Sequence, residues 1–247
     1  MPQPITPRRW AATLSALGAA LLLSACATAP GQVASATPAA RFDARMLDYS
    51  KAPASVRWTT VDEIARSLQG QPPMNVGFDV DDTVLYSSPC FFYGQQKYSP
   101  GKNDYLGNQA FWDDINASCD QYSVPKDVAR ALINMHQARG DTIYFITART
   151  PSPKEGLTAT LQKDFGIKNM QPVIFTGDKP VGARYAKTPA IRQTKLSIYY
   201  GDANSDIQAA QEAGIRAIRV LRAPNSTYTP LPDNGQLGEE VIRDSAW

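Results

Sequence analysis

The chain has 247 residues, of which 43% are hydrophobic and 19% charged, so it is long enough to bury one large core or two small ones. Its 25 basic and 23 acidic residues give a formal charge of only +2, which argues against binding a nucleic-acid polymer as its main role. The single histidine, His136, excludes a three-histidine zinc site and phosphohistidine chemistry with a second histidine as acid. Any hydrolysis must therefore use carboxylates, hydroxyls or lysine.

The first 25 residues have the pattern of an export signal. Two arginines precede an apolar run that is too short for a comfortable membrane span, and small residues follow up to Cys26. Residues 23–26, Leu-Ser-Ala-Cys, resemble the bacterial lipobox, in which the cysteine is lipidated and becomes the first mature residue. Plain cleavage by the ordinary signal peptidase nearby is the alternative. The next residue is alanine rather than aspartate, which favours the outer membrane.

Residues 26–41 are rich in Ala, Pro, Thr and Ser and predict a flexible tether, so the folded domain is expected over 42–247. We therefore expect an exported, periplasmic protein whose only membrane contact is a lipid anchor. Apart from Cys26, the sequence has two cysteines, Cys90 and Cys119. Because the periplasm is oxidising, we predict a disulfide between them; two buried free thiols are the alternative.

Apolar or β-branched runs alternate with helical stretches along the domain. In chain order, we predict a helix over 61–68, a strand over 74–78, a helix over 125–139, a strand over 142–146, a helix over 155–165, strands over 172–175 and 196–200, a helix over 205–213 and a strand over 217–221. Such runs suit strands that are buried on both faces. The alternation predicts an α/β fold, a three-layer doubly wound parallel sheet.

One segment, about 86–123, interrupts this alternation. It contains many aromatic side chains without a strong period, and it follows the first predicted strand of the sheet, where α/β enzymes keep their binding loops. We interpret it as an inserted cap. The alternative is that its aromatic side chains only fill a small satellite core.

Acidic side chains follow two of the predicted strands. Asp79 and Asp81 come directly after 74–78, and Asp202 and Asp206 follow 196–200. Asp79 and Asp81 are two residues apart, so both can point into one crevice at the carboxyl edge of the sheet. Carboxylates gathered there suit a hard divalent cation, and the sequence predicts one Mg²⁺ site. Helix capping explains either cluster alone but only weakly both together.

Polar groups also follow the strand predicted over 142–146. Thr147, Ala148 and Arg149 offer a hydroxyl, a backbone amide and a guanidinium that could hold phosphate oxygens, with capping of the next helix as the alternative. A lysine would complete such a site. Lys179 and Lys187 are the candidates, and spacing alone does not choose between them.

These elements resemble the haloacid dehalogenase-like phosphohydrolases, whose pattern is Asp-x-Asp-x-Thr, then Thr or Ser, then Lys, then Gly-Asp…Asp. The resemblance narrows to the bacterial class B acid phosphatases and runs from about residue 45 to the C-terminus. It rests on four blocks, which are residues 78–89, 173–180, 200–202 and 225–228. Class C acid phosphatases have Asp-Glu-Thr and Gly-Asp-Asn-Leu in the first and last blocks, which this chain lacks. The two domain cysteines and the lipobox are not part of the class B pattern.

The resemblance implies a role for each strand-end acid. Asp79 is the expected nucleophile, which forms an aspartyl-phosphate, and Asp81 is the expected general acid and base. Asp79, the backbone carbonyl of Asp81 and Asp202 are expected to hold Mg²⁺. Asp206 is expected just outside the metal, where it orients metal-bound water or Lys187.

The resemblance also implies how the substrate is bound. Thr147, Ala148, Arg149 and Lys187 are expected around the phosphoryl group, and Lys187 is preferred to Lys179 because the family's lysine lies beyond its Gly-Asp-Lys-Pro block. An apolar pocket for nucleobases and aromatic esters is expected from Phe91, Leu106, Trp112 and Tyr228. His136 is interpreted as structural. A homotetramer is implied by the family alone.

We therefore expect a Mg²⁺-dependent acid phosphatase that acts on small phosphomonoesters such as nucleoside monophosphates and aryl phosphates. Two alternatives remain: phosphotransfer to an alcohol or nucleoside, and a non-catalytic surface lipoprotein that uses the fold for binding. Intact Asp79 and Asp81 weigh against the latter.

Overall fold

The computed structural model describes residues 55–102, 104–168 and 170–247. The expected signal segment 1–25, the tether 26–41 and the candidate lipidation site Cys26 lie outside the described residues. Within the described ranges, no helix combines the length and the apolar character needed to cross a membrane.

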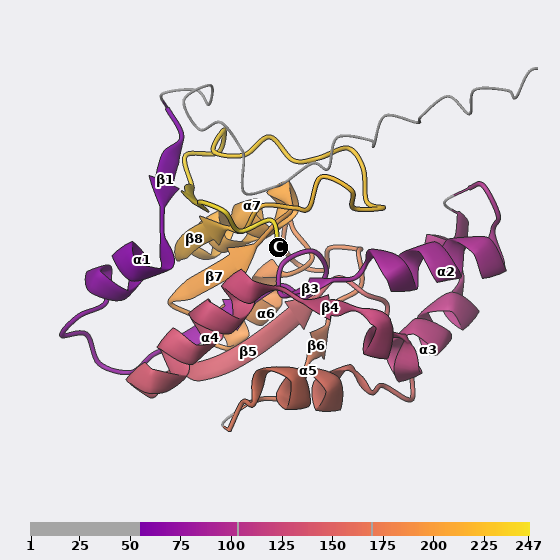
Figure 1. The fold of residues 1–247 in the computed structure, drawn as a ribbon, viewed down its shortest axis with the longest axis horizontal. Coiled ribbons are helices and arrows are strands. Elements are labelled where there is room, and N and C mark those ends of the chain that lie inside the picture. The colour runs from indigo at the N-terminus through magenta and orange to yellow at the C-terminus, as the bar shows by residue number, and fades with distance from the viewer. Residues whose placement is uncertain (1–54, 103, 169) are drawn as a thin grey trace, which may run out of the picture. The chain divides into compact units, whose positions relative to one another are not determined.

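A parallel sheet forms the centre of the described part of the chain (Figure 1). Its seven strands among the described residues have the order β1-β9-β8-β7-β2-β5-β6. Their bounds are β1 Arg57–Thr59, β2 Asn75–Phe78, β5 Thr142–Thr147, β6 Ile174–Phe175, β7 Ile198–Gly201, β8 Arg216–Arg219 and β9 Glu240–Ile242. Every neighbouring pair in this sheet is parallel, as the predicted α/β class requires.

Helices cover both faces of the sheet. Their bounds are α1 Val61–Ser67, α4 Asp127–Arg139, α5 Leu157–Phe165, α6 Thr188–Gln193 and α7 Asn204–Ala213. Buried side chains of α1, α4 and α5 pack on Val76 and Phe78 of β2, whereas those of α6 and α7 pack on the opposite face, against Ile146 and Tyr199. Alternate residues of each buried strand therefore serve two cores, which explains their continuous apolar sequence.

The cap, residues 86–123, folds as a small helical unit inserted after β2. It contains α2 Ser88–Tyr98, η3 Asp104–Gly107, α3 Gln109–Ser118 and η4 Cys119–Tyr122. A short antiparallel ladder of β3 Leu85–Tyr86 and β4 Val124–Pro125 closes its base. Figure 1 shows α2 and α3 on the side toward which β5 points. Cys90 and Cys119 form a disulfide between α2 and η4, with their Cα atoms 5.6 Å apart.

His136 of α4 belongs to a buried chain of hydrogen bonds that connects this helix to β7. Its Nδ1 is 2.7 Å from Asp141 Oδ2, and its Nε2 is 2.8 Å from the hydroxyl of Tyr200 in β7. Burial lowers the pKa of His136, although Asp141 opposes the shift. The neutral ring thus donates from Nδ1 and accepts from Tyr200 at Nε2, which supports a structural role.

Some predicted elements differ from the structure. The predicted strands and helices correspond to β2, β5, β6, β7, β8 and to α1, α4, α5, α7, with shifts of a few residues at their ends. Helix α4 begins at Asp127 rather than at Pro125, because Pro125 pairs with Leu85 of the strand β3 instead. Strands β1 and β9 and helix α6 were not predicted, since three to six residues are too few to show a period.

Candidate active site

The nucleophile candidate lies where two neighbouring strands end. Phe78 of β2 is in register with Tyr200 of β7, and the Asp79 backbone N–H donates to the Tyr200 carbonyl at 2.8 Å. This pairing brings the side chain that follows β2 next to the one that follows β7, Asp202. Both line a cavity of about 220 Å³ at the carboxyl edge of the sheet.

Lys187 joins two of the acids. Its Nζ contacts Asp79 Oδ1 and lies 2.6 Å from Asp206 Oδ1, and all three side chains are buried. Lys187 is the N-cap residue of α6. Although burial lowers its pKa, Asp206 and Asp79 raise it well above the usual value, so Lys187 stays cationic. Lys179, the other candidate, is exposed.

A glycine allows Asp206 to reach this position. Asp206 lies in the first turn of α7, and its Oδ2 accepts from the Ala203 backbone N–H at 3.1 Å. A Cβ on Gly201 would lie 2.3 Å from the Asp206 Cβ, far inside van der Waals contact. The strand must therefore end in glycine for the first turn of α7 to fold back onto Lys187.

Three carboxylates could hold a cation. Within the described ranges, Asp79, Asp202 and Asp206 each offer one oxygen, and these oxygens lie within 4.8 Å of one another. Burial and the neighbouring Asp206 raise the pKa of Asp79 well above its usual value, against the opposing effect of Lys187. The excess negative charge and the all-oxygen donor set fit a hard divalent cation. All three carboxylates accept hydrogen bonds from neighbouring side chains, and the family resemblance expects Asp79 and Asp202 as the ligands.

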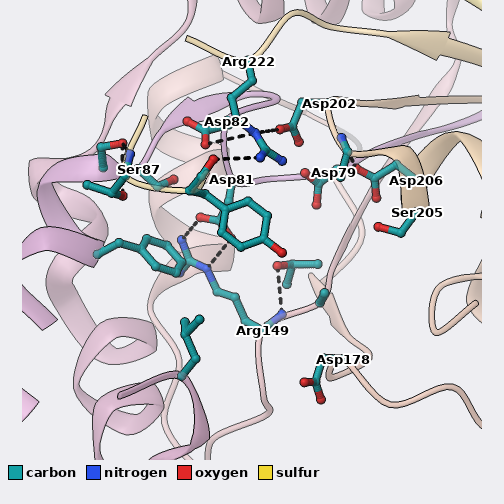
Figure 2. Close-up of a pocket in the computed structure, with 18 of the residues that line it drawn as sticks. Asp79, Asp81, Asp82, Ser87, Arg149, Asp178, Asp202, Ser205, Asp206 and Arg222 are labelled. Atoms are coloured by element: carbon teal, nitrogen blue, oxygen red, sulfur yellow. Dashed lines mark hydrogen bonds and ion pairs between the residues drawn. The ribbon is translucent and has the colours of Figure 1, made fainter. Parts of the chain in front are cut away.

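The side chain of Asp81 lies apart from these three acids. Figure 2 shows Asp81 facing Arg149, while Asp79, Asp202 and Asp206 gather on the other side of the cavity. Arg149 Nε and Nη2 donate to Asp81 Oδ2 and Oδ1 at 2.9 and 2.7 Å. Burial raises the pKa of Asp81, but Arg149 outweighs it and lowers the pKa below its usual value.

Residues at and just after the end of β5 line the same cavity as Lys187. Thr147 is buried at the end of β5, and its Oγ1 accepts from the Arg149 backbone N–H at 3.2 Å. Ala148 also lines the cavity. The Arg149 guanidinium is turned to carboxylates rather than to open space, so here it is not free for a bidentate phosphate contact.

The four apolar pocket residues also line this cavity. Phe91, Leu106 and Trp112 come from the cap, and Tyr228 comes from the segment after β8. The rings of Phe91 and Trp112 are 6.1 Å apart, edge to face. The Arg222 guanidinium lies 4.5 Å from the centre of the Tyr228 ring, and Tyr228 is 57% exposed. A flat ring could therefore enter from solvent and meet aromatic side chains.

Sequence reasoning missed three buried groups around the site. Arg222 Nε donates to Asp202 Oδ2 at 2.5 Å; it directly follows the apolar run 217–221, so the rule used for the acids would have found it. Lys126 Nζ donates to the carbonyls of Asp82 and Leu221, and burial lowers its pKa to about 8. Asp120 of the cap contacts Arg149. Neither Lys126 nor Asp120 has a sequence signal.

The sequence matches a family model and several curated proteins. The chain matches the family model of the HAD superfamily, subfamily IIIB (acid phosphatase), over residues 20–231. The class B acid phosphatase of Haemophilus parainfluenzae is 59% identical over 190 residues, which are 77% of this chain and 81% of that one. That of Haemophilus influenzae is 56% identical over 194 residues, covering 78% and 82%. That of a Marinomonas species is 46% identical over 229 residues, covering 92% and 96%.

Solved structures with a similar fold are more distant. A predicted phosphoglycolate phosphatase from Haemophilus somnus has a TM-score of 0.48 and 14% identity over 70% of this chain and 95% of that one. A likeness of that size adds nothing about the reaction. The family match and the identity to curated class B enzymes decide the matter: this chain belongs to subfamily IIIB of the HAD superfamily, the class B acid phosphatases.

Proposed function

We propose that the protein is a Mg²⁺-dependent phosphatase that hydrolyses small phosphomonoesters through a phosphoryl intermediate on Asp79. The arrangement of Asp79 carries the proposal. Its buried carboxylate faces a cavity of about 220 Å³ between the cation Lys187 and the acids Asp202 and Asp206. A nucleophile, charged groups for the phosphoryl oxygens and room for an ester therefore meet at one point.

The first step transfers the phosphoryl group to the enzyme. A carboxylate oxygen of Asp79 attacks phosphorus, and the bond from phosphorus to the ester oxygen breaks. Asp81 in its protonated form gives its proton to that leaving oxygen. Arg149 favours the ionised form of Asp81, whereas the incoming phosphate places negative charge beside it and favours the protonated form.

The second step returns Asp79 to its free form. Asp81, now ionised, accepts a proton from water, whose oxygen attacks phosphorus and displaces the Asp79 carboxylate. Lys187 and Thr147 stabilise the charge on the phosphoryl oxygens in both steps. Asp79 and Asp202 would hold Mg²⁺, which would neutralise the repulsion between the carboxylate and the phosphate.

The aromatic side chains support esters with flat leaving groups. Phe91, Trp112 and Tyr228 line the same cavity as Asp79, so a nucleobase or aryl group could stack there while its phosphate meets the nucleophile. Stacking tolerates different rings because each has a π-face, at about 1–3 kcal/mol for a base. Nucleoside monophosphates and aryl phosphates are therefore the proposed substrates.

Turnover of p-nitrophenyl phosphate and adenosine monophosphate tests the proposal. We expect Mg²⁺-dependent hydrolysis by the wild type and its loss in Asp79→Asn, with Asp62→Asn on the exposed surface of α1 as the matched control. Acid quench of the wild type during turnover should trap phosphate on Asp79, detectable by mass spectrometry. Full activity in Asp79→Asn would exclude this residue as the nucleophile.

We also propose that the protein is exported and anchored by a lipid on Cys26. The support is the sequence pattern of residues 1–26. Labelling cells with a tagged fatty acid should mark the wild type and leave Cys26→Ala unlabelled. A soluble, unlabelled wild type in the periplasmic fraction would contradict the anchor and favour ordinary signal cleavage.

A further inference from the structure

The guanidinium of Arg149 connects the cap to the catalytic residues. One edge of it, Nε and Nη2, binds Asp81 as described above. The other edge binds Asp120 of η4, with Nη1 2.7 Å from Oδ2 and Nη2 2.8 Å from Oδ1. Two bidentate carboxylate pairs therefore use four of its five N–H donors. Arg149 is 1% exposed and Asp120 is 3% exposed, so the Asp120 pair is shielded from water, whereas the Asp81 side chain is 25% exposed.

The Cys90–Cys119 disulfide holds together the two parts of the cap that contact Arg149. Cys90 and Cys119 are each followed by a residue that contacts the same guanidinium. Asp120, after Cys119, makes the bidentate pair, and the Phe91 ring, after Cys90, lies 5.9 Å from the Arg149 guanidinium carbon. Both halves of the bridge thus place a neighbour on Arg149. The Ser123 hydroxyl additionally donates at 3.2 Å to Asp120 Oδ1, the oxygen that also accepts from Arg149 Nη2, and so helps to hold that carboxylate.

We propose that Asp120 is a positioning residue for the catalytic acid: clamped by the Cys90–Cys119 disulfide, it holds the Arg149 guanidinium in the orientation that aims Asp81 at the leaving oxygen. Asp120 touches neither the nucleophile nor the expected metal ligands. It acts through Arg149, whose planar fork sets the plane of the Asp81 carboxylate. This inference rests on the proposed function, in which Asp81 protonates the leaving group.

The role predicts a specific kinetic change. A misplaced general acid harms esters whose leaving oxygen needs a proton, such as those of aliphatic alcohols. It harms p-nitrophenyl phosphate much less, because nitrophenolate leaves without one. The ratio of kcat/KM for p-nitrophenyl phosphate to kcat/KM for glycerol 2-phosphate therefore reports the aim of Asp81. Partial unfolding or loss of active enzyme lowers both values equally and leaves the ratio unchanged.

Asp120→Asn is the direct test. The variant keeps the shape of the side chain but turns an amide toward the arginine, so one of the two donor–acceptor pairs is lost. We expect the ratio to rise by about tenfold or more, because a small misplacement of a catalytic group can lower a rate about 100-fold. Asp114→Asn, which removes a half-buried carboxylate paired with Lys97 in the same cap, is the matched control and should leave the ratio unchanged.

The disulfide is tested separately with Cys90→Ala/Cys119→Ala. This double variant keeps Asp120 and Arg149 but removes the covalent link between α2 and η4. We expect the ratio to rise in the same direction as in Asp120→Asn, though by less, because Ser123 still holds Asp120. Circular dichroism identifies a variant that has not folded. If Asp120→Asn does not fold, the ratio in the double variant decides the proposal.

The outcomes separate this inference from the proposed function. Wild type that hydrolyses neither ester, or that keeps activity in Asp79→Asn, would overturn the function itself. With the function intact, equal losses for both esters in Asp120→Asn would overturn the positioning role of Asp120. An unchanged ratio in the folded double cysteine variant would overturn the role of the disulfide.

Discussion

Replacing Lys187 with methionine should leave the buried carboxylates of Asp79 and Asp206 without a compensating positive charge. Lys187 makes ion pairs with both Asp79 and Asp206, and its side chain is only 8% exposed. Removing one partner of a buried pair costs about 3–5 kcal/mol, because the remaining carboxylates stay buried without compensation. The same change should lower kcat about 100- to 1000-fold, as does the loss of one preorganised group that stabilises transition-state charge.

Urea unfolding measures the loss of stability and a phosphatase assay measures the loss of kcat, both on the same protein preparation. Lys179→Met is the matched control, since Lys179 lies eight residues earlier and is exposed. It should change neither stability nor kcat appreciably. Adding Mg²⁺ should reduce the instability of Lys187→Met, because the cation supplies positive charge beside Asp79.

A double variant tests the reasoning more sharply. Lys187→Met/Asp206→Asn removes one buried cation and one buried anion together, so it should recover about 1–3 kcal/mol relative to Lys187→Met alone. Activity should not return with stability, since Lys187 is still missing from the phosphoryl site. If the double variant is less stable than the single one, or if Lys187→Met keeps kcat within about tenfold, the assigned charge balance is wrong.

Three further outcomes follow from the structure. Gly201→Ala should push Asp206 away, since the new Cβ would meet it at 2.3 Å; we expect an unfolding free energy lower by about 1–3 kcal/mol and a reduced kcat. EDTA should abolish turnover and lower the melting temperature, and Mg²⁺ should restore both; unchanged values would exclude a metal. Burial lowers the pKa of His136 below the unfolded value of 6.5, so the unfolded chain binds more protons below that pH. Urea unfolding at pH 7 and pH 5 should therefore show a loss of stability in the wild type that is smaller in His136→Gln.

The strand-end acids could be predicted because their signal is local. Asp79 and Asp202 each follow a run of buried residues, and parallel strands must end at the same edge of the sheet. Once β2 and β7 pair, no further information is needed to bring the two carboxylates together. Lys187 required the family resemblance, because a lysine in a loop carries no pattern of its own.

The order of the sheet and its outer strands could not be predicted in this way. Strands β1 and β9 have three residues each, and their pairing joins Trp58 to Val241, at opposite ends of the described chain. Such a pairing depends on which edge of the sheet is still unpaired, and no local hydrophobic period in the sequence indicates it. Similarly, the helix predicted over 125–139 includes Pro125, which in the structure pairs with Leu85 of β3, a strand of only two residues.

The side-chain partners of Arg149 are the clearest example of contacts that could not be predicted from the sequence. Its position after β5 predicted a phosphate ligand, and in the structure four of its donors are used by Asp81 and Asp120. A fully buried arginine must be paired, but the chain has 23 acidic residues, and nothing near Arg149 in the sequence indicates which of them it meets. The partner comes from the cap, where no period marks it, and its place depends on a disulfide 29 residues in span. Catalytic groups at strand ends can therefore be predicted from the local sequence pattern, whereas the residues that orient them are determined by tertiary packing.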